Sequence, residues 1–135
     1  YFAQVLSPDY KPSEAMAAYI KSGNLGKKTG KGFFDWSQGR PKIDLSKATK
    51  EWELNHLIAL QVNEATKVLE EGVADDPKEV DLAMANGGGS PFGPFLLAQQ
   101  IGYPVLLAKL DEIYKAFPLD IFKPTKTMQE GKIKV

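Results

Sequence analysis

The sequence predicts an all-α fold, a compact bundle of about five helices, and three observations support this. Apolar residues recur every three or four positions through residues 54–69 and 106–117, a spacing that places them on one face of a helix. No segment alternates apolar and polar residues with the two-residue period of a half-buried strand. With 135 residues and 43% hydrophobic content, the chain is long and apolar enough to bury one core.

The first helix signal lies near the N-terminus. Pro12 and Ser13 form a helix start in which the Ser13 hydroxyl caps the first turn, and Gly23 ends this helix. Residues 37–44 contain Gly, Arg and Pro without periodicity, so they are predicted to be a linker.

Between helix and linker lies a basic, glycine-rich segment, residues 25–36, with the sequence LGKKTGKGFFDW. It misses the phosphate-loop pattern because Lys31 is followed by Gly32 rather than by Ser or Thr. A turn that anchors its aromatic residues on the core is therefore favoured, and contact with a phosphate is the alternative.

A helix of about 25 residues is expected next, capped by Ser46 and ending at Gly72. Residues spaced one turn apart along it should form a single buried stripe: Leu54, Leu57/Ile58, Gln61/Val62, Ala65 and Val68/Leu69. Asn55 lies one turn before Ala59, which places an amide beside a small residue and leaves room for a ligand to approach.

Asp76 and Pro77 begin a further helix with a capping box, and its inward residues are expected to be Val80, Ala83 and Met84. Residues 87–95, GGGSPFGPF, form a loop with a defined path, because glycines permit unusual φ values and prolines fix φ.

Two more helices complete the prediction. Residues 94–101 form a short apolar helix that Gly102 closes. Pro104 starts the last long helix, and Pro118 ends it. Its buried stripe should consist of Leu106, Leu110, Ile113 and Phe117.

Composition excludes several function classes. Seventeen basic residues balance seventeen acidic ones, so no overall field favours nucleic acid or an anionic membrane as a partner. No apolar run approaches the ~18 residues of a membrane span. Cysteine is absent, which excludes disulfides and thiolate chemistry and is compatible with the expected cytoplasmic location.

The chain contains an internal echo. Residues 122–128, FKPTKTM, repeat the pattern of residues 10–16, YKPSEAM: aromatic, Lys, Pro, hydroxyl, two variable residues, Met. The echo indicates that residues 1–44 are the tail of one helical repeat plus a linker, and that residues 45–135 are a second repeat. Because the chain opens at Tyr1 inside an apolar run, we interpret it as a piece of a longer polypeptide.

Few residues offer chemistry. His56 is the only histidine, so multi-histidine metal sites are excluded, and a structurally satisfied histidine is favoured over a general base. The glycines of residues 87–93 follow a helix where a dinucleotide fingerprint needs a strand, so no cofactor-binding residue is predicted. Asn55 is the one candidate site residue: its amide either holds a substrate carbonyl or satisfies a neighbouring helix end.

On these motifs the chain resembles the C-terminal helical domain of the 3-hydroxyacyl-CoA dehydrogenases. Residues 25–34 resemble the closing motif of that domain, and four further segments resemble its body: 55–58 (NHLI), 64–72, 80–84 (VDLAM) and 87–95. The resemblance implies NAD-linked oxidation of a 3-hydroxyacyl-CoA, with NAD bound by a preceding Rossmann domain outside this chain.

The order of these motifs differs from that of a single-copy enzyme, where the closing motif follows the loop rather than preceding it. The resemblance therefore implies a second repeat, in a multifunctional fusion with an enoyl-CoA hydratase module. It implies that Asn55 aligns with the family's catalytic Asn and is here a non-functional remnant. Leu96, Gln99 and Pro104 stand where the family usually has Glu, Asp and Asp, which agrees with such decay.

The expected function follows from this resemblance. The domain would pack against the preceding repeat or a second subunit and shape the acyl-CoA cleft, and it would be inactive alone. A stand-alone helical interaction or dimerisation module is the alternative.

Overall fold

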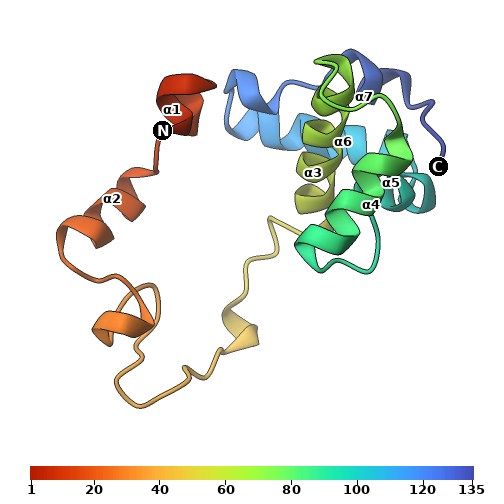
Figure 1. Cartoon of the computed structure of the whole chain (residues 1–135). Helices are drawn as coiled ribbons and strands as arrows, with labels where there is room; N and C mark the ends of the chain where they lie inside the picture. Colours follow the sequence, from red (N-terminus) through yellow and green to blue (C-terminus); the bar gives the residue numbers. More distant parts are fainter. The chain divides into compact units, whose positions relative to one another are not determined.

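The computed structural model describes all 135 residues, which divide into an N-terminal unit, residues 1–49, and a C-terminal unit, residues 50–135. The boundary predicted from the sequence lies between residues 44 and 45. Residues 26–35 hold two isolated β-bridges, and no strand forms, so the all-α prediction is confirmed. The α-helices are α1 Phe2–Val5, α2 Glu14–Lys21, α3 Leu54–Glu70, α4 Pro77–Gly88, α5 Pro94–Ile101, α6 Tyr103–Ala116 and α7 Lys126–Glu130 (Figure 1).

The C-terminal unit is the predicted bundle, and α3 is its central helix. α3 packs against α5, α6 and α7, and α4 packs against α5. The main core joins α3, α5, α6 and α7 through side chains spaced one helical turn apart: Ile58, Ala59, Val62, Ala98, Leu106, Leu110 and Met128. Their burial is the main stabilising contribution in a chain without disulfides.

The start of α3 corrects the sequence prediction. The helix begins at Leu54, whereas Ser46 lies in a separate 3-10 helix, Leu45–Lys47. The reason is the side chain of His56, whose Nδ1 accepts the N–H of Glu53 at 3.0 Å and so satisfies a free donor at the helix start. Trp52 packs edge-on against the His56 ring, with 5.0 Å between ring centroids. Together these contacts hold the preceding chain out of the helix.

Parts of the predicted buried stripes are exposed. Ile58, Val62 and Ala65 are buried, but Leu54 and Leu57 in the first turn of α3 are exposed. On α4, Val80 is buried against Ala65 of α3 and Phe95 of α5, while Ala83 and Met84 are exposed.

At the end of α6, Phe117 is also exposed rather than buried. It stacks on Trp52, with ring centroids 5.9 Å apart, at the edge of the bundle.

A row of polar side chains on α3 holds the segment that leads into α7. The Asn63 amide donates to the carbonyl of Lys123 and accepts the N–H of Thr125, each at 3.0 Å. Thr66 and Thr125 share a hydroxyl hydrogen bond of 2.7 Å, and Thr125 also caps α7. Because Asn63 and Thr66 are almost fully buried, these bonds satisfy polar groups that water does not reach.

Glu70 extends this row and gives it a pH dependence. Its carboxylate accepts the N–H of Thr127 at 2.6 Å, and this hydrogen bond is the main reason that the Glu70 pKa lies below its ordinary value of 4.5. A lowered pKa in the folded state means that the stabilisation is complete above pH ~4.5 and is lost as the pH falls through the folded pKa. We expect Glu70→Gln to lose less stability than the wild type between about pH 5 and pH 3, measured by urea unfolding. Equal losses in both proteins would contradict this.

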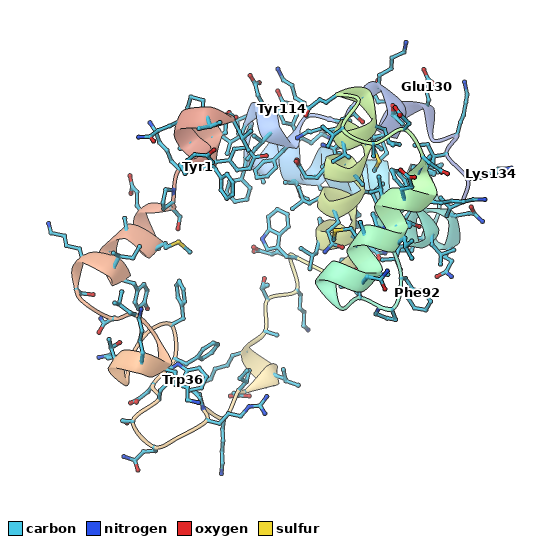
Figure 2. All side chains as sticks on the ribbon, in the orientation of Figure 1. Tyr1, Trp36, Phe92, Tyr114, Glu130 and Lys134 are labelled. Carbon is cyan, nitrogen blue, oxygen red and sulfur yellow. The ribbon has the colours of Figure 1, made fainter.

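The N-terminal unit confirms the predicted helix start. The Ser13 hydroxyl accepts the N–H of Met16 at 3.2 Å and caps α2, whose C-cap is Ser22, next to Gly23. Figure 2 shows side chains crowded between the helices of the C-terminal unit. Many side chains of residues 14–49 instead point away from the backbone without forming a packed core.

The basic turn, residues 25–36, is held by hydrogen bonds within the turn rather than by packing on a core. The Thr29 hydroxyl accepts the N–H of Leu25 at 2.9 Å and lies within hydrogen-bond distance of two carbonyls of the turn. Phe33 packs against Tyr19 with the rings tilted and 4.6 Å between ring centroids, but it stays 65% exposed, and Phe34 is also exposed. The predicted anchoring of these aromatic residues on a core is therefore wrong within this chain.

Candidate functional site

Asn55, the candidate site residue, lies in the first turn of α3. It is partly buried and precedes the buried residues Ile58 and Ala59 by one turn. No hydrogen bond within the chain engages its side-chain amide, so it does not satisfy a neighbouring helix end here. Ala59 is completely buried in the main core, so this small residue allows close helix packing rather than leaving open space.

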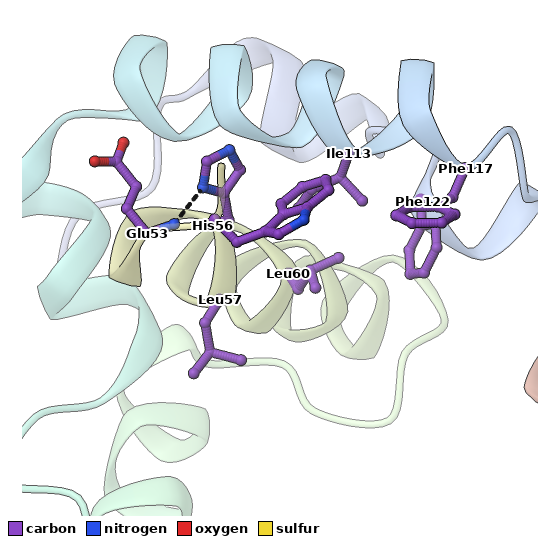
Figure 3. Close-up of a pocket in the computed structure, with 8 residues that line it drawn as sticks. Glu53, His56, Leu57, Leu60, Ile113, Phe117 and Phe122 are labelled. Atoms are coloured by element: carbon purple, nitrogen blue, oxygen red, sulfur yellow. Dashed lines mark hydrogen bonds between the residues drawn. The ribbon is translucent and has the colours of Figure 1, made fainter. Parts of the chain in front are cut away.

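Beside this turn lies an apolar pocket of about 300 Å³ (Figure 3). α3 and α6 form two of its sides, and Trp52 and Phe122 complete it. The lining residues are Trp52, Glu53, His56, Leu57, Leu60, Ile113, Phe117 and Phe122. An apolar lining with one imidazole and one carboxylate at its rim suits an apolar chain rather than a charged group.

Both ring nitrogens of His56 are engaged, as the sequence favoured. Nδ1 accepts the N–H of Glu53, so the neutral ring carries its proton on Nε2, which donates to Oε2 of Glu112 at 2.9 Å. The hydrogen bond from His56, followed by that from Lys109, lowers the pKa of the Glu112 carboxyl. Lys109 also pairs with Glu53 at 2.9 Å. His56 therefore joins the start of α3 to α6 and has no free nitrogen to act as a base.

The glycine-proline loop is organised by Asp81, a residue that the sequence analysis did not single out. Its two carboxylate oxygens accept the N–H groups of Phe95 and Leu96, each at 2.8 Å, and so cap α5 from the neighbouring helix α4. Gly93 lies against Asp81 so closely that an added Cβ would sit 2.2 to 2.4 Å from Asp81 atoms. No local pattern predicts this role, because Asp81 is mid-helix and its partners follow 14 and 15 residues later.

The glycines at the start of residues 87–95 differ in how much the structure restricts their replacement. Gly89 ends α4 with φ 66°, a conformation that other residues rarely adopt. Gly87 is helical, and a Cβ added there meets nothing within 4 Å. We expect Gly87→Ala to raise the free energy of unfolding by about 0.5–1 kcal/mol, because alanine has less freedom to lose on helix formation. Urea unfolding measures this change, and a decrease would show that the glycine has another role.

The described residues do not fit a dinucleotide. The N–H groups at the start of α5, the ones in this loop that would bind a phosphate, already donate to Asp81. No three His, Cys, Asp or Glu side chains gather as a set that could hold a metal ion. None of the helices combines the length and apolar character that crossing a membrane requires.

These elements define the class of the C-terminal unit: an all-helical domain in which α3 is central and Asp81 of α4 caps α5. The family described as 3-hydroxyacyl-CoA dehydrogenase, C-terminal domain, matches residues 53–131, from the N-cap of α3 to the C-cap of α7. This is more than half of the chain, so the chain belongs to that family. The resemblance stated from the motifs is confirmed.

The curated proteins that this chain resembles are several times longer than the chain. The peroxisomal bifunctional enzyme of Cavia porcellus is 30% identical over 132 residues, which cover 81% of this chain and 18% of the relative. The fatty acid oxidation complex subunit alpha of Vibrio campbellii is 31% identical over 121 residues, covering 79% of this chain and 17% of the relative. The chain thus spans less than a fifth of the length of these relatives.

Two solved structures are similar. 3-Hydroxybutyryl-CoA dehydrogenase from Escherichia coli matches with a TM-score of 0.68 at 16% identity, covering 89% of this chain and 44% of that one. This likeness shows the fold. (S)-3-Hydroxybutyryl-CoA dehydrogenase from Ralstonia eutropha matches with a TM-score of 0.55 at 30% identity, covering 90% of this chain and 38% of that one.

Proposed function

We propose that this chain is part of an NAD-dependent 3-hydroxyacyl-CoA dehydrogenase of fatty-acid β-oxidation, in which the C-terminal unit is the second of two similar helical domains. The observation that carries the proposal is the family match over α3–α7 together with a second copy of the α7 cap in residues 8–16. Residues 1–44 would then be the tail of the first helical domain and a linker.

The extent of the alignments supports this order. The fatty acid oxidation complex subunit alpha of Vibrio vulnificus aligns with 88% of this chain, more than the C-terminal unit alone comprises. Part of the N-terminal unit therefore has a counterpart in a relative of that name. We infer that the parent is a multifunctional enzyme, with an enoyl-CoA hydratase module as the fused activity.

The role of the domain in that enzyme would be packing rather than chemistry. A groove of about 340 Å³ lies between α3 and α4, lined by Leu60, Gln61, Glu64, Ala65, Val68, Val80, Met84 and Pro94. Together with exposed Leu54 and Leu57 on α3, it offers an apolar surface to the preceding helical domain or a second subunit. Packed there, the domain would shape the acyl-CoA cleft from outside, while NAD binds in a domain that precedes this chain.

Asn55 provides the test. If the first helical domain supplies the working Asn, Asn55→Ala in the complete enzyme should leave kcat and kcat/KM for a 3-hydroxyacyl-CoA nearly unchanged. Removal of a donor that stabilises a transition state costs about a hundredfold or more, so a loss of that size would overturn the remnant assignment. Asn86→Ala, which removes an exposed asparagine from α4, is the matched control.

The second candidate, a stand-alone interaction or dimerisation module, is favoured by the exposed apolar groove alone. Isothermal titration of this chain with NADH and with an acyl-CoA bears on both proposals. No tight NADH binding is expected, and tight binding would contradict the placement of NAD outside the chain. Reading the gene upstream decides between them, because the module requires no dinucleotide-binding segment there. A cytoplasmic location stays a prediction, since the relatives include an enzyme named peroxisomal.

A further inference from the structure

Residues 8–16 repeat the local structure of residues 120–128. Each segment begins with a 3-10 helix that ends at an aromatic residue, Pro8–Tyr10 in one and Asp120–Phe122 in the other. The following lysine has φ −64° and ψ 139° at Lys11, and φ −63° and ψ 132° at Lys123. The sequence echo therefore has a counterpart in the backbone.

The caps agree as well. The residue after the proline has φ −60° and ψ 153° at Ser13, and φ −67° and ψ 164° at Thr125. Each hydroxyl accepts the N–H of the methionine three residues later, at 3.2 Å for Met16 and 3.0 Å for Met128. Seven residues with the same pattern, the same backbone path and the same cap indicate the same docking element.

The surroundings of the two copies differ. Met128 is fully buried in the main core, and the Asn63 amide bridges the carbonyl of Lys123 and the N–H of Thr125. Met16 is 44% exposed, and the carbonyl of Lys11 and the N–H of Ser13 have no amide partner within the chain. Residues 8–16 thus have the backbone shape of a docked segment, but Met16 is not buried as Met128 is.

We propose that residues 10–16 dock on the long helix of the preceding helical domain, as residues 122–128 dock on α3. This rests on the proposed function, which places such a domain before this chain. The host helix would present an Asn whose amide bonds to Lys11 and Ser13, a hydroxyl residue three positions later as at Asn63 and Thr66, and an apolar hole for the Met16 side chain. The C-terminal unit of a second copy is not the host, because its own Thr125 and Met128 fill that place.

A graft into the full chain tests this docking without any activity measurement. Replacing residues 122–128 by the sequence of residues 10–16 requires Phe122→Tyr, Thr125→Ser, Lys126→Glu and Thr127→Ala, and it retains the methionine. If the two segments are equivalent, the graft unfolds cooperatively with Tm within about 5 °C of the parent. Adding Asn63→Ala should lower Tm by the same amount in the graft and in the parent.

The matched control is the same graft with Thr125→Ala in place of Ser, which lacks the hydroxyl cap and should have a lower Tm than the graft. The proposal is overturned if the graft lowers Tm as much as Met128→Ala does in the parent, or if Asn63→Ala no longer matters in the graft. It is also overturned if the wild-type chain dimerises in sedimentation velocity and Met16→Ala dissolves the dimer, since the host would then be a second copy. A failure of the Asn55 test leaves these outcomes unchanged.

Discussion

Gly93→Ala is expected to lower the free energy of unfolding of the C-terminal unit by about 3 kcal/mol or more. An added Cβ would lie 2.2 Å from Cγ and 2.4 Å from Cα and Cβ of Asp81. The Asp81 Cα belongs to the backbone of α4, so a rotamer change does not remove the clash. Gly93 has φ −78°, an ordinary value for alanine, and the cost is therefore steric rather than conformational.

The clash would also disturb the cap of α5. Moving α4 away from Gly93 lengthens the two 2.8 Å hydrogen bonds between Asp81 and the start of α5, where Phe95 is completely buried. Urea unfolding followed by circular dichroism measures the loss. Gly87→Ala is the control, since it adds the same methyl group in open space six residues earlier. Equal stability of the two variants would contradict the close approach.

Asn63→Ala is expected to lower the free energy of unfolding by about 3 kcal/mol. The Asn63 side chain is nearly fully buried and satisfies both the carbonyl of Lys123 and the N–H of Thr125. Alanine would leave two backbone groups without partners where water has little access, and each such group costs about 1–3 kcal/mol. The segment leading into α7 would loosen, and Met128 would lose its fixed place in the core.

Two companions make this result specific. Gln61→Ala removes an exposed amide from the same helix and should change stability by less than about 0.5 kcal/mol. Asn63→Asp keeps the acceptor for Thr125 but places a carboxylate against the carbonyl of Lys123, so it should be at least as destabilising as alanine. Hydrogen exchange at Met128 should accelerate in both Asn63 variants. Unchanged exchange would contradict the role of Asn63 in holding α7.

Several helix ends were predictable because their signals are local. The Ser13 cap, the Asp76-Pro77 start and the Gly102 stop each act within one helical turn, and the structure has all three. Periodicity also identified the cores of α3 and α6, since Ile58, Val62 and Leu110 recur at the helical spacing and are buried.

The predictions that failed depended on side-chain contacts that residue type and spacing do not record. Ser46 has a good capping side chain, but α3 starts at Leu54 because His56 and Trp52 hold the preceding segment in a different path. Met84 has the right spacing for burial, but it lies in the open groove between α3 and α4 and stays 40% exposed. A helical pattern states which residues share a face and not whether another element reaches that face.

The sequence by itself determined the all-α class, the family resemblance and the echo between residues 10–16 and 122–128, because each is recorded in residue types at fixed spacing. Only the tertiary structure decided what the polar residues do. Asp81 caps a helix that begins 13 residues later, and Asn63 holds a segment some 60 residues away. Those bonds form only when packing brings distant segments together and excludes water. Through them, a polar residue in a helix holds a distant segment of the chain in place.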